Sequence, residues 1–202
     1  MSAPKAANPD HPIHDLLAAR WSPYSFTDRP VPEGDLKSIF EAARWAASSY
    51  NEQPWRYIVA TKADAEGFDT LLSCLVEANQ AWARNAPVLA IGCFSRILAY
   101  NGKPNAAAEH DLGAASAALT MEATARGLFV HQMIGIDPER ARQLFSVPED
   151  YQPLTGIAIG YLGDAPGLDP KYGERDRAPR QRKPLSEIVF QGRWGEPSGL
   201  IG

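Results

Sequence analysis

Apolar residues recur at helical spacing in several stretches of the chain. Within residues 32–47, Leu36, Ile39, Phe40 and Ala43 follow the i, i+3, i+4, i+7 spacing of a helix with one buried face. Spacing and start signals such as Asp137-Pro138 predict further helices at 13–19, 63–77, 109–126 and after residue 137. The helix at 109–126 is dense in alanine, so we expect another helix to approach it closely, either in the core or in a dimer interface.

Short apolar runs bounded by turn residues predict strands. The predicted strands are 55–61, 88–94, 129–133 and 154–161. Along the last strand, bulky residues such as Ile157 and Ile159 face one side, while Gly156, Ala158 and Gly160 face the other. A face of such small side chains allows a helix or a flat ligand to approach the backbone closely.

The composition changes after residue 163. The remaining segment is rich in Pro, Gly and Arg, with one short apolar stretch at 185–190, so it cannot bury a core of its own. It is either disordered or wrapped over another surface, and Phe190 and Trp194 favour wrapping around a second copy of the chain. The predicted organisation is a disordered lead (1–12), a main domain (13–163) and a C-terminal arm that completes it (164–202).

The overall composition limits the class of protein. A chain of 202 residues and 22.0 kDa suits one domain, and 45% apolar with 22% charged residues is ordinary for a soluble globular protein. A net charge of −4 and a pI near 5.6 argue against nucleic acid or an anionic membrane as the main partner. Two cysteines and a start without an apolar leader predict a cytoplasmic protein.

The stretch from Ser48 to Tyr57 is crowded with hydrogen-bonding side chains. Asn51 and Gln53 each offer a donor and an acceptor, the mixture that the pyrimidine edge of a flavin needs. Pro54 then fixes the backbone where a loop becomes a strand. Taken alone, the stretch is more simply interpreted as a polar turn.

Two basic segments have the chemistry of a phosphate site. Arg20 and Ser22 lie in a turn-rich segment near the start, and Arg180, Arg182 and Lys183 form a cationic cluster near the end. Arginine donates paired, charge-assisted hydrogen bonds to phosphate. As isolated features, a capped loop and a solvated surface run are the simpler interpretations.

Other chemistries lack the residues that they require. His11 and His14 have no third ligand nearby, so no metal site is predicted. Gly156, Gly160 and Gly163 do not have the spacing or the following helix of a dinucleotide-binding fingerprint. No catalytic acid or base is assigned.

Taken together and in this order, these segments resemble the FMN-dependent nitroreductase family. The resemblance extends over about residues 14–194, and its most specific element is the Ser-Ser-x-Asn-x-Gln-Pro-Trp-Arg run at 48–56. The segments that carry it are 20–22, 42–57, 127–135, 157–161 and 182–185.

The resemblance implies an α+β fold: a mostly antiparallel central sheet flanked by helices, in an intertwined homodimer with FMN sites at the subunit interface. It also implies which residues bind the cofactor. These are Arg20, Ser22, Arg180 and Arg182 around the phosphate, Ser48, Asn51 and Gln53 along the flavin, and Gly135, whose N–H would be aimed near flavin N5.

The chain departs from the family pattern at three positions. Tyr24 stands where the family usually has Arg or Lys near the flavin N1/O2 edge, and Tyr supplies no charge there. Ala47 replaces a proline, a minor change in loop stiffness. Ile134 occupies a position that is acidic in some members.

The activity implied by the resemblance is transfer of hydride from NAD(P)H, through FMN, to an electron-poor acceptor. The absence of a dinucleotide fingerprint favours transient nicotinamide binding in a pocket shared with the acceptor. A different flavin reaction on the same fold, such as reductive dehalogenation or dehydrogenation, and a non-catalytic flavin-binding dimer remain alternatives. Aromatic candidates for covering the flavin face are Trp82, Phe94 and Tyr100, although core packing explains them equally well.

Overall fold

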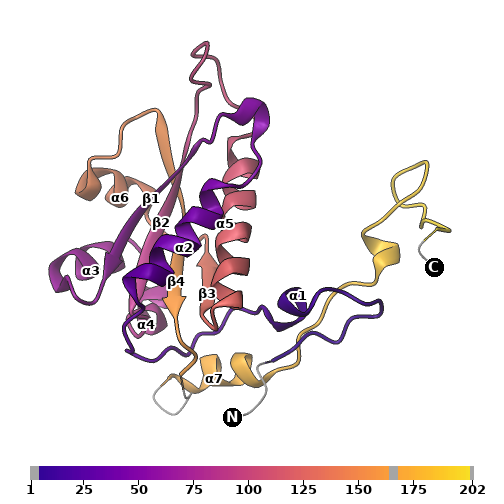
Figure 1. Ribbon diagram of the computed structural model, residues 1–202, viewed down its shortest axis with the longest axis horizontal. Coiled ribbons are helices and arrows are strands. Elements are labelled where there is room, and N and C mark those ends of the chain that lie inside the picture. Colours follow the sequence, from indigo (N-terminus) through magenta and orange to yellow (C-terminus); the bar gives the residue numbers. More distant parts are fainter. Residues whose placement is uncertain (1–4, 164–167, 201–202) are drawn as a thin grey trace.

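One antiparallel sheet organises the molecule (Figure 1). The computed structural model describes residues 5–163 and 168–200, and its four strands follow the order β1-β2-β4-β3. They are β1 (Trp55–Thr61), β2 (Val88–Ser95), β3 (Phe129–Met133) and β4 (Tyr151–Gly160). Every neighbouring pair is antiparallel. This confirms the antiparallel α+β fold, and β3 lies at one edge of the sheet.

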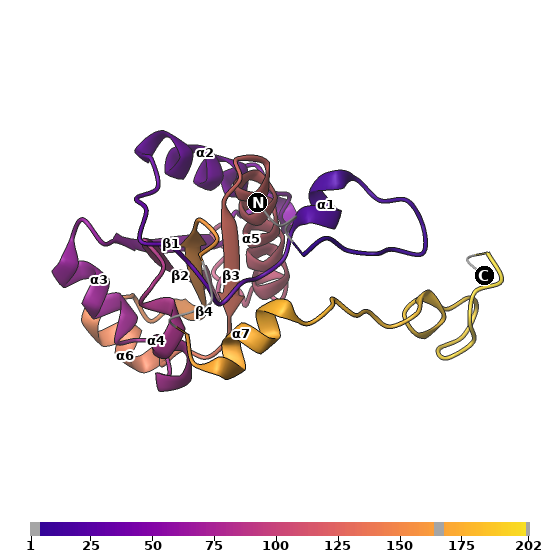
Figure 2. The same cartoon turned by 90° about the horizontal axis from the view of Figure 1, so that it is seen from below.

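Helices cover both faces of the sheet (Figures 1 and 2). The long helices α2 (Glu33–Arg44) and α5 (Ala108–Ala125) pack together on one face. The opposite face is covered by α3 (Ala65–Leu72), α4 (Glu77–Ala83) and α6 (Pro138–Phe145). The short α1 (Asp15–Ala19) and α7 (Pro170–Arg177) lie at one end of the sheet. Among the described residues, no helix combines the length and apolarity needed to cross a bilayer.

The small residues of β4 serve close packing. A Cβ atom at Gly160 would lie 2.5 Å from Cδ of Pro87, and one at Gly156 would lie 2.9 Å from Cδ2 of Leu75. Ile157 and Ile159 on the other face are fully buried against the α2–α5 side. The two faces of β4 therefore match the two sides of the core, as the alternation of small and large residues predicts.

The prediction of one helix over 63–77 is wrong. The chain leaves the helical path after Leu72 and starts α4 at Glu77. In between, Leu75 forms a bridge with Ile136, and the Val76 N–H donates to the Gly135 carbonyl oxygen at 3.1 Å. Pairing with a distant segment thus takes backbone groups that a continuous helix would have used itself.

The C-terminal segment contains a helix that its composition did not predict. Asp169 caps α7 by accepting a hydrogen bond from the Lys171 N–H at 3.0 Å. Tyr172 is buried, and its hydroxyl donates to the Ala78 carbonyl oxygen at 2.6 Å. Beyond α7 the chain extends away from the body (Figures 1 and 2) and exposes 92% of Trp194. Part of the predicted arm therefore packs on the main domain, and residues 164–167 lie outside the described residues.

Candidate functional site

Three arginines from the two ends of the sequence gather in one place. Burial, and then the charge of Arg182, lower the pKa of Arg20. Burial lowers the pKa of Arg180 as well, with smaller contributions from Arg20 and Arg182. None of the three forms an ion pair with a carboxylate in residues 5–163 or 168–200. Three like-charged guanidiniums that have no ion-pair partner among the described residues have the chemistry of an anion site.

This arginine cluster (Arg20, Arg180 and Arg182) has polar partners and an adjoining cavity. A guanidinium nitrogen of Arg20 donates to the Ser22 hydroxyl at 3.4 Å, and Arg180 donates to the Ala18 carbonyl oxygen at 2.6 Å. The cavity measures about 590 Å³ and is lined by residues 7–11, 13, 180–183 and 185. The structure therefore brings together the four residues assigned to the phosphate.

The segment that carries Arg20 and Ser22 is anchored on β3. Trp21 is buried with its ring centroid 5.8 Å from that of Phe129. Nδ1 of His131 lies 2.8 Å from the Pro23 carbonyl oxygen, so this nitrogen carries the proton and donates it. Burial lowers the pKa of His131, which favours the neutral ring.

The loop Ser48–Gln53 is held in an unusual backbone conformation. Tyr50, Asn51 and Gln53 have positive φ angles of 53°, 56° and 49°. Each such non-glycine residue costs about 1 kcal/mol or more, so the surroundings must hold the loop. The Ser48 hydroxyl accepts from the Gln53 N–H at 3.0 Å, and the Gln53 side chain donates to the Asn51 carbonyl oxygen at 3.0 Å.

A buried carboxylate fixes this loop to α5. Asp111 lies in the first turns of α5 with 2% of its surface exposed, and its Oδ2 accepts from the Ser49 N–H at 3.1 Å. The sequence interpretation missed Asp111. The sequence feature that could have identified it is its i, i+4, i+8 spacing with Ala115 and Leu119, which places this acidic residue on the helix face that packs into the core.

The loop and the arginine cluster lie at opposite ends of α5. Asp111 ties the loop to the beginning of the helix, whereas Trp21 packs on Phe129, just after the helix ends. Eighteen helical residues span about 27 Å. Within one chain, Asn51 and Gln53 are therefore not brought together with Arg20 and Arg180.

Gly135 follows the edge strand β3 and is held by α4. Its carbonyl oxygen accepts from the Val76 N–H at 3.1 Å and from the Asn79 side chain at 3.0 Å. A Cβ atom at this position would lie 2.5 Å from Nδ2 of Asn79, so a larger residue would displace that side chain. The Gly135 N–H donates to no group in the described part of the chain, and it is free to meet an acceptor.

Tyr24 sits in an aromatic cluster next to the arginines. Its ring lies 5.2 Å from Trp82, 4.7 Å from His131 and 5.0 Å from Tyr172, between centroids. Arg175 of α7 donates to the Tyr24 hydroxyl at 3.3 Å. A cation from α7 thus reaches the position where the family pattern has its own Arg or Lys.

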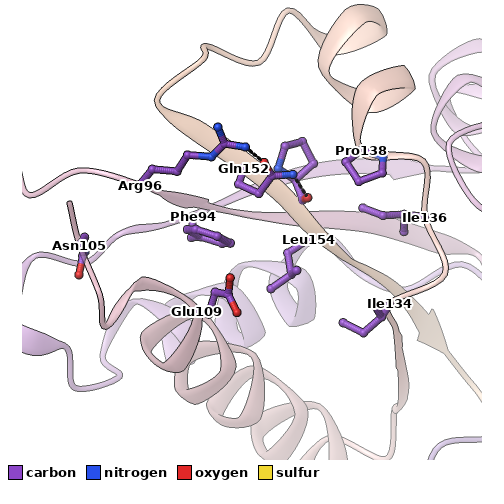
Figure 3. Close-up of a pocket in the computed structure, with 10 residues that line it drawn as sticks. Phe94, Arg96, Asn105, Glu109, Ile134, Ile136, Pro138, Gln152 and Leu154 are labelled. Atoms are coloured by element: carbon purple, nitrogen blue, oxygen red, sulfur yellow. Dashed lines mark hydrogen bonds between the residues drawn. The ribbon is translucent and has the colours of Figure 1, made fainter.

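The three aromatic candidates for covering a flavin have different surroundings. Trp82 is fully buried in the core, while Tyr100 is exposed and lies 5.7 Å from the ring of Tyr50. Phe94 lines a cavity of about 540 Å³ together with Ile134 and Ile136, the sequence neighbours of Gly135 (Figure 3). Core packing accounts for Trp82.

That cavity was not predicted from the sequence. Glu109 points toward the space between Phe94 and Leu154, and Arg96 donates to Gln152 across the opening (Figure 3). Asn105 is buried, and its Nδ2 has no partner among the described residues. The remaining lining residues are Ile134, Ile136, Pro138 and Pro153.

Comparison with known proteins agrees with this architecture. The model of the nitroreductase family matches residues 17–161. An uncharacterized 15.4 kDa protein of Mycolicibacterium smegmatis is 37% identical over 151 residues, which are 70% of this chain and 99% of that protein. An NADH dehydrogenase of Thermus thermophilus is 28% identical over 194 residues, covering 80% of this chain and 86% of the enzyme.

A solved structure is similar over nearly the whole chain. The crystal structure of an oxidoreductase containing FMN superimposes with a TM-score of 0.89 at 35% identity, covering 97% of this chain and 100% of the other. Together with the family model, this likeness confirms the resemblance inferred from the five sequence segments. The chain belongs to the nitroreductase family of oxidoreductases.

Proposed function

We propose that this chain is an FMN-dependent oxidoreductase that takes hydride from NADH or NADPH and delivers it to an electron-poor acceptor. The acceptor class is a nitroaromatic, a quinone or an activated alkene. The observation that carries the proposal is the arginine cluster, which places three guanidiniums together without a carboxylate partner in the described residues. The FMN-containing structure and the NADH dehydrogenase among the relatives support the cofactor and the electron donor.

The residues present fit FMN. Arg20, Arg180 and Arg182 would hold the phosphate, with the Ser22 hydroxyl beside them. The free N–H of Gly135 would meet a flavin acceptor such as N5. Loop Ser48–Gln53 would present two carboxamides, which can donate and accept along the pyrimidine edge.

The separation of loop and arginine cluster supports a site shared by two chains. One α5 holds the loop at its beginning, and the arginines lie beyond its end. In a homodimer with antiparallel α5 helices, the loop of one subunit would meet the arginine cluster of the other. The outward side of α5 carries His110, Gly113 and Ala117, small or polar exposed residues that permit close helix approach.

The extended arm also supports the homodimer. Trp194 and Leu200 are 92% and 83% exposed, and Ile188 is 56% exposed. Apolar side chains on a segment that leaves the body are explained by a partner surface. We therefore propose that residues 179–200 wrap a second copy of the chain, as predicted for the arm.

Bound FMN would supply the redox chemistry, accepting hydride at N5 and passing it on. The chain's own residues would position the flavin and the acceptor and would exclude water from the site. The cavity shown in Figure 3, with apolar walls from Phe94, Ile134 and Leu154, would receive a planar acceptor near N5. No side chain is assigned as a general acid, and water supplies the proton that reduction of the acceptor requires. Two buried, free cysteines accord with the proposed cytoplasmic location.

The decisive experiment is spectroscopic. Purified protein, as isolated or after incubation with FMN and gel filtration, is expected to be yellow, and anaerobic NADH or NADPH should bleach its visible absorption. A nitroaromatic or quinone should then restore the colour. Protein that cannot be loaded with FMN would overturn the proposal, and flavin that stays oxidised with both nicotinamides would favour a non-catalytic flavin-binding dimer.

Light scattering after gel filtration tests the shared site. The full chain is expected to elute at twice its 22.0 kDa mass. Truncation after residue 187 removes Ile188, Trp194 and Leu200 and is expected to weaken the dimer and FMN binding together. A monomer that retains full FMN affinity would contradict a site built from two chains.

A further inference from the structure

A carboxylate on α7 links the two segments that carry the arginine cluster. Asp176 accepts from the Tyr24 N–H with both oxygens, at 3.0 and 3.1 Å, and from the Ser25 N–H at 3.0 Å. Ser25 and Asp176 are 151 residues apart in sequence. Two successive backbone N–H groups thus converge on a single side chain, an arrangement suited to a fixed carboxylate.

The link stands within a few residues of every arginine in the cluster. On one side, Tyr24 lies a few residues after Arg20 and Ser22. On the other side, Asp176 lies a few residues before Arg180 and Arg182. Figure 2 shows α7 running beneath the sheet toward the start of the arm. The position of α7 therefore determines where the guanidiniums of Arg180 and Arg182 lie relative to that of Arg20.

The helix itself is firmly placed. Tyr172 and Asp176 are four residues apart and so lie on one face of α7. Tyr172 is buried and donates to the Ala78 carbonyl oxygen of α4 at 2.6 Å, while Asp176 holds residues 24–25. The same face thus ties the arm both to the core and to the first arginine segment.

A restraint of this kind is needed because the cluster repels itself. Burial is the main cause that lowers the pKa of Arg20 and of Arg180. Arg182 lowers both pKa values further, and Arg20 adds to the shift of Arg180, so the like charges interact. Repulsion would move the start of the arm away from residues 20–22 when no anion is bound. The bonds of Asp176 to residues 24 and 25 oppose that movement.

We propose that Asp176 is a positioning residue that holds the two arginine segments in register for a phosphate. This assignment rests on the proposed function, because the phosphate is that of FMN. Asp176 does not touch the ligand in this role. The negative charge of Asp176 would by itself repel a phosphate, so removing that charge should strengthen FMN binding on electrostatic grounds. Loss of positioning should instead weaken FMN binding.

The test uses D176N with E174Q as its matched control. Both variants remove one negative charge from α7, but Glu174 is exposed and its side chain makes no hydrogen bond in the described part of the chain. Flavin fluorescence is titrated with FMN and with riboflavin, which has no phosphate. D176N is expected to weaken FMN binding about tenfold, since an amide replaces a charged acceptor, and to leave riboflavin binding unchanged. E174Q should leave FMN binding unchanged or slightly tighter.

The outcomes separate this assignment from the proposed function. Tighter FMN binding by D176N, unchanged FMN binding, or an equal loss for FMN and riboflavin would each overturn the positioning role. Wild-type protein that binds neither flavin would overturn the proposed function and this assignment with it. If D176N does not fold, D176E carries the test, because it keeps the charge but displaces the carboxylate; it must lose FMN affinity selectively.

Discussion

The two ends of α5 carry two groups of candidate flavin-binding residues that are built in opposite ways. At its beginning, loop Ser48–Gln53 is a continuous segment with a strained backbone, held mainly by bonds within itself and by Asp111. Beyond its end, the arginine cluster uses ordinary backbone conformations but joins segments from both ends of the sequence. Contacts around the loop therefore hold a strained backbone in place, whereas contacts around the arginine cluster hold like charges together.

The difference has a consequence for cofactor binding. The loop keeps its shape through neutral hydrogen bonds and a buried carboxylate, so it is expected to be formed before any ligand binds. The arginine cluster has no ion-pair partner among the described residues, and a bound anion would supply one. Phosphate binding should therefore be the salt-sensitive part of the interaction, and the loop the salt-insensitive part.

The largest expected effect comes from removing the charges of the cluster. The double variant R20A/R180A is expected to weaken FMN binding by about 100-fold or more, from two lost charged donors, and to spare riboflavin. Titrations at low and high salt measure it, and the salt dependence of the wild type should be reduced in the variant. R84A, which removes an exposed arginine at the end of α4, is the control. Equal loss of riboflavin affinity would mean that these arginines hold the fold instead.

The next effect tests how the loop is held. Replacing Asp111 by Ala leaves the Ser49 N–H without its acceptor in the described structure and is expected to cost about 2–3 kcal/mol of unfolding free energy. D111N keeps an oxygen in place and should cost less. Urea unfolding measures both, with E109A on the exposed side of the same helix as control. An unaffected D111A would show that the loop does not depend on this bond.

The same contrast explains what the sequence predicts. The loop could be recognised because its residues are contiguous, and β1 and β3 have the predicted bounds, since their apolar runs are short and clearly bounded. Arg20, Ser22, Arg180 and Arg182 were assigned only through the family resemblance. Their proximity in space, and the role of Asp176, depend on contacts across 151 residues that no local pattern contains.

Two errors have physical causes of the same kind. The break between α3 and α4 follows from pairing of Leu75 and Val76 with residues 135–136, which overrides the helical spacing. Asp169-Pro170 is the same start signal as Asp137-Pro138, yet α7 was missed because the surrounding composition suggested a segment without structure. Tyr172, whose buried side chain packs α7 on the main domain, was the sequence feature that could have indicated this helix.

A smaller effect isolates the strain in the loop. Tyr50 is 80% exposed with φ of 53°, so glycine is favoured there by the backbone. Y50G is expected to be about 1 kcal/mol more stable than Y50A, because both lack the ring and only alanine is strained. In the middle of α5, A118G should instead be about 1 kcal/mol less stable than the wild type. Urea unfolding measures both differences. If glycine is less stable than alanine at both positions, residue 50 is not strained.

The smallest effect concerns acidification near the arginine cluster. Because burial lowers the pKa of His131 in the folded state, the unfolded chain binds more protons once the pH falls below its ordinary pKa of about 6.5. The unfolding free energy of the wild type should therefore decrease as the pH falls from about 6.5 to the lowered pKa of His131. H131Q lacks this titration, so its stability should depend less on pH over that window. Identical pH profiles for wild type and H131Q would mean that the buried ring, held by the Pro23 carbonyl oxygen and facing Tyr24 and Trp82, takes up its proton as readily as in the unfolded chain.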